Sequence, residues 1–140
     1  MNARIKERIS ELEQFISDLE SIVPTDFGEY KTDVKTRAAC ERFFEKIVEG
    51  LVDLAFLVIK EKGLKTPEED KEAFDILAGA RIISPKSGIG LKQARGMRNI
   101  LAHDYGRIDD SLVFESLSTE IIRDATAFLA AIKKHGGKNV

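Results

Sequence analysis

Cysteine, histidine and tryptophan are scarce or missing in this sequence, and each shortage excludes a kind of site. The 140 residues include one cysteine, two histidines and no tryptophan. A single cysteine, Cys40, excludes an internal disulfide and a cysteine metal cluster, and its apolar neighbours predict a buried, inert thiol. The two histidines, at positions 103 and 135, do not have the spacing of zinc or iron ligands. We therefore expect no metal and no cofactor.

Long hydrophobic runs are missing as well. The longest one, residues 54–59, is far shorter than the roughly 18 residues of a membrane span, and the N-terminus lacks the pattern of a signal peptide. With 43% apolar and 33% charged residues, the composition is that of a folded, water-soluble chain. We expect a cytoplasmic protein with no membrane contact, folded as a single domain over residues 1–140.

A large net charge is also missing, although basic residues gather in one segment. The net charge of −2 argues against nucleic-acid affinity spread over the whole surface. Residues 85–108 contain five basic residues and one acid, which gives 5 − 1 = +4 and leaves −2 − 4 = −6 for the remainder. A solvated basic helix face is the ordinary interpretation of such a cluster. The residues inside this cluster favour a functional one.

Apolar spacing predicts two long helices in the first half of the chain. Apolar residues recur at steps of four and three from Ile5 to Leu19, which predicts a helix over about residues 2–22. Residues 24–28 predict a loop. A second helix of roughly 30 residues is expected from a cap at Thr32 or Asp33 to Gly63. Its expected inward positions are Val34, Ala38, Phe44, Ile47, Leu51, Leu54, Val58 and Ile59.

Three shorter helices are expected in the second half. Residues 66–69 resemble a capping box and predict a third helix that ends before Pro85. Residues 86–90 contain glycine but lack both phosphate-loop spacings, so a turn is predicted there. A fourth helix follows from Leu91, and a fifth begins at a cap formed by residues 109–110 and carries Leu112 inward. Five helices without strands predict an all-α fold, an antiparallel four- to five-helix bundle.

Side chains suited to phosphate chemistry gather at the end of the expected fourth helix. Residues 98–105 read Arg-Asn-Ile-Leu-Ala-His-Asp-Tyr. The guanidinium of Arg98 is a permanently charged planar fork that fits phosphate. The imidazole of His103 has an unperturbed pKa of about 6.5 and exchanges a proton near neutrality. This pairing indicates phosphodiester chemistry.

The pattern Arg98-x4-His103-x-Tyr105, preceded by Arg95, resembles the catalytic motif of the HEPN superfamily. It is most similar to HepT-like toxin ribonucleases of type VII HepT/MntA-like toxin–antitoxin systems. The similarity extends over most of the chain: the long second helix with Arg37 and Arg42, the short third helix, and the start of the last helix at residues 108–109 all fit.

What the resemblance implies is a metal-independent endoribonuclease toxin that acts on RNA as a symmetric homodimer, with the motif helices of both protomers lining one cleft. A small nucleotidyltransferase antitoxin would silence it by transferring AMP onto the motif tyrosine, which matches Tyr105. The catalytic positions match Arg98 and His103, and Asn99 matches the supporting polar position. The basic residues that are candidates for RNA binding are Arg95, Lys92, Arg107 and Arg37.

Cleavage of RNA through its 2′-hydroxyl needs a base, an acid and positive charge at the phosphate. His103 is expected to exchange the proton, and Arg98 to stabilise the developing charge. On an ideal helix, however, these two residues are separated by about 140°, whereas Asn99 and His103 share a face. Either the helix end is distorted or the cleft is completed across a dimer.

Two other functions remain open. One is a non-catalytic HEPN module that binds nucleotides or serves as the helical partner of a nucleotidyltransferase. The other is a purely structural bundle.

Overall fold

A computed structural model describes residues 1–103 and 108–137 of the chain, and all the regular secondary structure in these two ranges is helical. The helices are α1 (Ala3–Ile22), α2 (Phe27–Thr32), α3 (Val34–Glu61), α4 (Asp70–Gly79), α5 (Pro85–His103), α6 (Asp110–Glu115), the π-helical η2 (Ser116–Glu120) and α7 (Ile121–Gly137). The predicted all-α class is confirmed.

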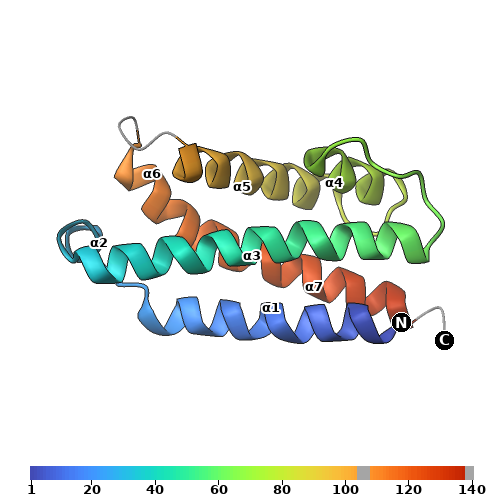
Figure 1. The fold of residues 1–140 in the computed structure, drawn as a ribbon, viewed down its shortest axis with the longest axis horizontal. Helices are drawn as coiled ribbons and strands as arrows, with labels where there is room; N and C mark the ends of the chain where they lie inside the picture. Colours follow the sequence, from blue (N-terminus) through green and yellow to red (C-terminus); the bar gives the residue numbers. More distant parts are fainter. Residues whose placement is uncertain (104–107, 138–140) are drawn as a thin grey trace.

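The body of the molecule is formed by the long helices α1, α3, α5 and α7, whose arrangement Figure 1 shows. α1 and α3 run antiparallel beside each other, and α5 and α7 pack on α3. The short α4 lies next to α5, whereas α2 and α6 lie together at the end of the bundle where α5 ends. The antiparallel arrangement agrees with the bundle predicted from successive helices without strands.

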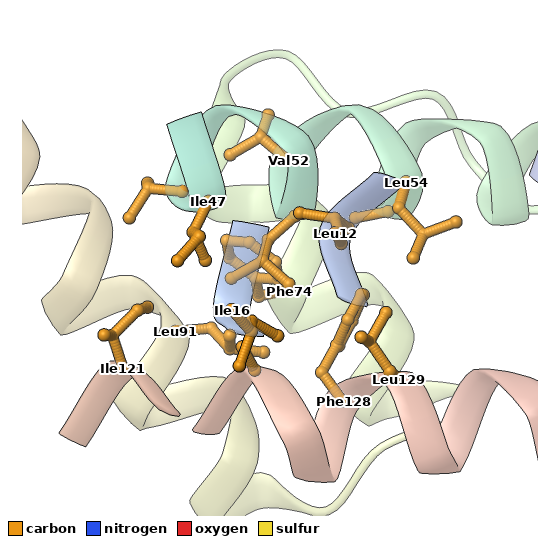
Figure 2. Packing of buried hydrophobic residues seen from close by; sticks show 14 of the residues in the cluster. Leu12, Ile16, Ile47, Val52, Leu54, Phe74, Leu91, Ile121, Phe128 and Leu129 are labelled. Atoms are coloured by element: carbon orange, nitrogen blue, oxygen red, sulfur yellow. The ribbon is translucent and has the colours of Figure 1, made fainter. Parts of the chain in front are cut away.

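The core is one continuous apolar cluster to which all the long helices contribute. Figure 2 shows Leu12 of α1, Ile47 of α3, Phe74 of α4 and Phe128 of α7 meeting in its centre. The rings of Phe74 and Phe128 contact edge to face, with centroids 6.1 Å apart, which is a favoured geometry for aromatic pairs. This packing fixes α5 through Leu91 and Leu101, which are both buried.

Side-chain caps define where three helices begin. Asn2 Oδ1 accepts a hydrogen bond from the Ile5 amide (2.9 Å), and Asp33 Oδ1 accepts one from the Thr36 amide (3.1 Å). Asp109 Oδ1 accepts one from the Ser111 amide (3.0 Å). The predicted caps at Asp33 and Asp109 are confirmed. Hydrogen bonds to the carboxylates lower the pKa of both aspartates.

Several predicted boundaries are wrong, each for a local reason. The expected loop at residues 24–28 includes the first two residues of α2, and this helix, whose Tyr30 side chain is buried in the core, was not predicted. The expected capping box at residues 66–69 is not used, because α4 begins only at Asp70. Residues 86–90 are helical and not a turn, since Ser84 Oγ accepts a hydrogen bond from the Ser87 amide and starts α5 at Pro85.

Three inward assignments are also wrong. Val34 and Ala38 in the first turns of α3 are exposed, and so is Leu112 in α6. The N-terminal turns of α3 project beyond the other long helices, as Figure 1 shows, so Val34 and Ala38 do not reach the core that those helices form. The expected fifth helix is divided by η2.

Candidate functional site

α5 places the residues of the motif. Its buried residues Leu91 and Leu101 face the core, and this orientation turns Arg98 toward α3. Asn99 and His103 are exposed on another side of the helix. The different surroundings of Arg98 and His103 agree with the angular separation expected from an ideal helix. The structure does not bring the Arg98 and His103 side chains of one chain together.

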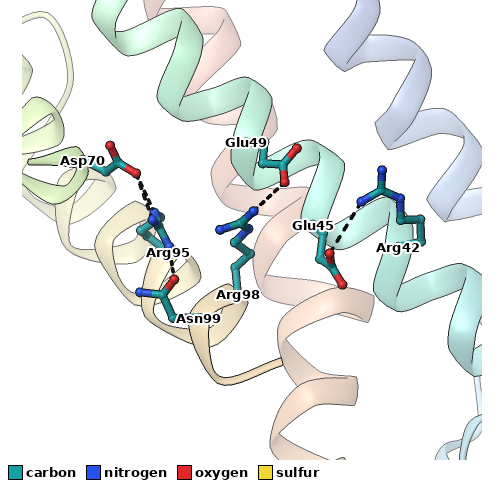
Figure 3. A network of polar contacts seen from close by, with 7 residues as sticks. All are labelled: Arg42, Glu45, Glu49, Asp70, Arg95, Arg98 and Asn99. Carbon is teal, nitrogen blue, oxygen red and sulfur yellow. Dashed lines mark hydrogen bonds and ion pairs between the residues drawn. The ribbon is translucent and has the colours of Figure 1, made fainter. Parts of the chain in front are cut away.

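Arg98 forms an ion pair with α3. Its Nη2 donates to Glu49 Oε1 at 2.5 Å, a contact drawn in Figure 3. The Arg98 side chain is 24% exposed, compared with 46% for Glu49. The Nε atom of Arg98 is buried and has no hydrogen-bond partner among the residues that the structure describes. An unsatisfied guanidinium N–H is costly, so this arginine retains capacity for a further acceptor.

Arg95 lies about one turn before Arg98 in α5 and is held by Asp70 of α4. Its Nε and Nη2 both donate to Asp70 Oδ2, at 3.0 and 2.9 Å. Its Nη1 donates to Asn99 Oδ1. Figure 3 shows the resulting chain of contacts from α4 through Arg95 to Asn99. Asn99 is thus oriented by Arg95, which gives it a supporting position beside the candidate catalytic residues.

A small cavity lies beside the two arginines. It has a volume of about 180 Å³ and is lined by Val48, Glu49, Val52, Asp53, Asp70, Arg95 and Arg98. The guanidinium groups meet carboxylates here, so the site is a set of ion pairs and not an unpaired basic patch. An RNA phosphate would therefore have to compete with Glu49 and Asp70 for the arginines.

The other predicted residues lie farther along the fold or outside its described part. Lys92 forms an ion pair with Asp75 at 2.9 Å. Arg37 lies 3.9 Å from Asp110 and donates to the Lys31 carbonyl at 3.3 Å, so it joins α3 to the start of α6. Tyr105 and Arg107 lie outside the described ranges.

The sequence did not reveal Glu49 and Asp70 as partners of the arginines. Both acids lie far from the motif along the chain, and no spacing rule links them to it. One signal was available for Glu49. It lies on the polar side of a long amphipathic helix, and a helix that packs on α3 would meet it there.

The described ranges also bear on a metal site, a reactive thiol and a membrane span. Among residues 1–103 and 108–137, no group of three or more histidine, cysteine, aspartate or glutamate side chains is placed to hold a metal ion. Cys40 is fully buried, as predicted, and burial raises the pKa of its thiol to about 11, which disfavours the reactive thiolate. None of the described helices has the length and apolar character of a membrane span.

Comparison with known proteins agrees with the fold and with the family that the sequence resembles. A model of the ribonuclease HepT-like family matches residues 5–132. A protein of Archaeoglobus fulgidus is 30% identical over 108 residues, which cover 75% of this chain and 80% of its own length. The mRNA nuclease HepT of Shewanella oneidensis is 23% identical over 133 residues, 95% of this chain and 98% of the relative.

A solved structure is also similar. It contains the tri-AMPylated HEPN toxin of Shewanella oneidensis in complex with MNT antitoxin, and it aligns with a TM-score of 0.88 at 23% identity. The alignment covers 96% of this chain and 99% of the toxin chain. At this identity the likeness establishes the fold.

The helical bundle has the fold that the resemblance to the HEPN class of proteins implied. Within that class, this chain belongs to the ribonuclease HepT-like family. The resemblance stated from the sequence is thereby confirmed, together with the class of endoribonuclease that it implies.

Proposed function

We propose that this protein is a metal-independent endoribonuclease toxin, folded as one domain and active as a homodimer. The observation that carries the proposal is the placement of two side chains by α5. Arg98 lies against α3 with an unsatisfied Nε, and His103 is exposed at the C-terminal end of α5. One side chain is suited to phosphate and the other to proton transfer.

The reaction follows from these two groups. An imidazole removes the proton from the RNA 2′-hydroxyl, whose oxygen attacks the adjacent phosphorus. The bond from phosphorus to the 5′-oxygen breaks, and an imidazolium returns a proton to that leaving oxygen. Arg98 stabilises the charge on the phosphate oxygens, and proton transfer contributes a factor of about 10²–10⁴. A base and an acid are both needed, and one chain provides one histidine at the site.

A second copy of the chain would supply the other histidine. Ile89, Gly96, Ile100 and His103 lie within about 60° of one another around α5. Ile89 is 56% exposed and Ile100 is 43% exposed. A Cβ at Gly96 would meet only the Nζ of Lys71, at 3.5 Å, so a partner helix can approach closely there. Packing of this α5 face on its counterpart would bring the His103 side chains of the two protomers to one interface.

Control of the enzyme is proposed at Tyr105. In the presence of a nucleotidyltransferase, its phenolic oxygen would attack the α-phosphorus of ATP, form an O–P bond and release pyrophosphate. The chain has two tyrosines, and the other, Tyr30, is fully buried. The AMPylation of the similar Shewanella toxin, and its complex with MNT antitoxin, support this step. The added phosphate would compete with RNA for Arg98.

A single-site chemical substitution tests the proposed reaction. RNA that contains one preferred cleavage position is incubated with the protein in EDTA, beside the same RNA with a 2′-deoxy sugar at that position. We expect cleavage of the first and none of the second, because the nucleophile is missing. Equal cleavage of both would refute the 2′-hydroxyl mechanism, and loss of all cleavage in EDTA would refute metal independence.

One observation favours a second candidate, a HEPN module that binds nucleotides or a nucleotidyltransferase without cutting RNA. Arg95 and Arg98 are each already paired with a carboxylate. In that case the intact RNA would bind to the protein and remain uncut under all conditions of the test above.

A further inference from the structure

A larger cavity shares one lining residue, Asp53, with the small cavity beside Arg98. The larger cavity has a volume of about 680 Å³ and lies between the first turns of α1, the last turns of α3 and the connection to α4. The α3 residues Glu49, Asp53, Phe56 and Lys60 follow one another at steps of four, three and four, so they form one stripe on that helix. We name these two adjoining cavities the α3 groove.

The groove combines an apolar floor with a basic rim. Phe56 and Leu57, both partly exposed, contribute to the floor. Arg4, Arg8 and Lys60 form the rim. Arg8 is paired with Glu11 at 3.0 Å and lies 3.7 Å from Asp53. Within the described ranges, neither Arg4 nor Lys60 has an ion-pair partner.

We propose that the α3 groove binds the single-stranded part of the RNA that extends from the scissile phosphate at Arg98. This inference rests on the proposed function and names the place where the substrate continues. Single-stranded RNA alternates flat apolar bases with charged phosphates, and proteins bind it with aromatic side chains beside basic ones. The stripe from Glu49 to Lys60 is about 16 Å long at 1.5 Å per residue, enough for a short run of nucleotides.

The charge balance of the groove favours RNA. Its lining has five basic residues, Arg4, Arg8, Lys60, Arg95 and Arg98, and three acidic ones, Glu49, Asp53 and Asp70. The balance is 5 − 3 = +2, and each of these acids is within ion-pair distance of an arginine. An acidic peptide would also be attracted by this charge. Arg98, the candidate phosphate ligand, lines the smaller of the two cavities, and this favours the nucleic acid.

A binding measurement with matched variants tests the proposal. Fluorescence anisotropy is recorded with a labelled single-stranded RNA and the full-length His103→Ala protein, which leaves the RNA intact. Adding Arg4→Gln and Lys60→Gln together is expected to weaken binding about tenfold. The slope of log K against log salt should become shallower by about 1.4, because two phosphate contacts are lost. Phe56→Leu, which keeps the floor apolar, should weaken binding through lost stacking.

The control removes the same two charges from the same two helices outside the groove. Lys6→Gln in α1 and Lys35→Gln in α3 are both exposed positions that line neither cavity. This pair should leave the affinity within about twofold of the parent. Equal losses of RNA affinity in the groove double variant and in the control double variant would overturn the proposal, because they would indicate a general charge effect. No loss for the groove pair would also overturn it and leave the groove to a protein partner.

Cleavage assays separate this inference from the proposed function. If the parent protein cleaves RNA, the Arg4→Gln and Lys60→Gln double variant should raise KM about tenfold for a long RNA. It should leave unchanged the KM for a dinucleotide that spans only the scissile phosphate. An unchanged KM for the long RNA would overturn the proposal that the α3 groove binds RNA and would leave the nuclease proposal intact. If the parent does not cleave but the groove pair still weakens RNA binding selectively, the nuclease proposal fails and the groove stands. A parent that binds no RNA overturns both.

Discussion

At the scale of single residues, the important finding is that carboxylates hold the arginines of the motif. Glu49 and Asp70 come from α3 and α4, and they orient Arg98 and Arg95 in the absence of RNA. Because both pairs are partly exposed, each contributes little to stability, on the order of 1 kcal/mol or less. Their larger effect is on phosphate binding, since an acid and a phosphate compete for one guanidinium.

Glu49→Gln should therefore strengthen RNA binding. The amide still offers an oxygen to Arg98 but no longer neutralises its charge, so the affinity of the His103→Ala protein for single-stranded RNA should rise roughly two- to fivefold at low salt. Anisotropy titrations measure this change. Glu45→Gln is the control, because Glu45 pairs with the exposed Arg42 on the same helix, 3.6 Å away. Weaker binding for Glu49→Gln alone would contradict competition and show that Glu49 is needed to position Arg98.

Tyr105 provides a second test at this scale. Incubation with the cognate nucleotidyltransferase and ATP should add AMP to the parent and stop RNA cleavage. Tyr105→Phe should stay unmodified and retain more than about half of the activity, because the phenol is assigned no part in the cleavage step. Intact-protein mass spectrometry follows the modification. Tyr30→Phe is the control, since Tyr30 is fully buried. Addition of AMP to Tyr105→Phe would contradict the assignment.

At the scale of helices, the sequence predicted the elements whose signals are local. The apolar stripe of α1 and the caps Asp33 and Asp109 led to correct helices, because spacing and capping act within a few residues. α2 was missed, since Tyr30 is buried against Phe114 of α6, which is a tertiary contact. The start of α4 was misplaced by a capping-box pattern that the chain does not use.

The Asp109 cap predicts a pH-dependent stability. Hydrogen bonds from Ser111 and Leu112 lower the pKa of this carboxyl from 3.8. A lowered folded-state pKa means that the cap stabilises the protein above about pH 4 and that this contribution is lost as the pH falls through the folded-state pKa. Asp109→Ala should lower Tm by roughly 2–5 °C at pH 7 and by clearly less at pH 3.

Thermal unfolding monitored by circular dichroism measures this difference. Asp109→Asn is the control, because an amide oxygen still accepts the two backbone hydrogen bonds, and its Tm at pH 7 should lie close to that of the parent. A Tm difference between the parent and Asp109→Ala that stays constant from pH 7 to pH 3 would show that the carboxylate charge does not contribute to stability.

At the scale of the whole molecule, the proposed reaction calls for a second subunit. Arg98 pairs with Glu49 of α3 and His103 is exposed, so the proposed function joins them across a dimer. Helical periodicity alone predicted this separation. The motif also located the candidate residues correctly on the last turns of α5. The acidic partners and the α3 groove could not be predicted, because they arise where helices far apart in the sequence come together.

A charged substitution on the α5 face tests the dimer. Ile100→Asp should convert a dimer into a folded monomer, because it places a charge in an apolar contact, and should reduce RNA cleavage at least tenfold. Analytical ultracentrifugation gives the mass, and circular dichroism confirms the fold. Val34→Asp changes another exposed apolar residue, 65% exposed at the start of α3, and should stay dimeric. A fully active Ile100→Asp monomer would contradict the composite cleft.

The most direct test of the central claim is single-turnover RNA cleavage in EDTA by the two histidine variants. The chain has two histidines; His103 ends α5 and His135 lies in the last turn of α7. His103→Ala should lower the cleavage rate by about 10²–10⁴-fold, whereas His135→Ala should cleave like the parent. Cleavage by His103→Ala at the parental rate would contradict the account.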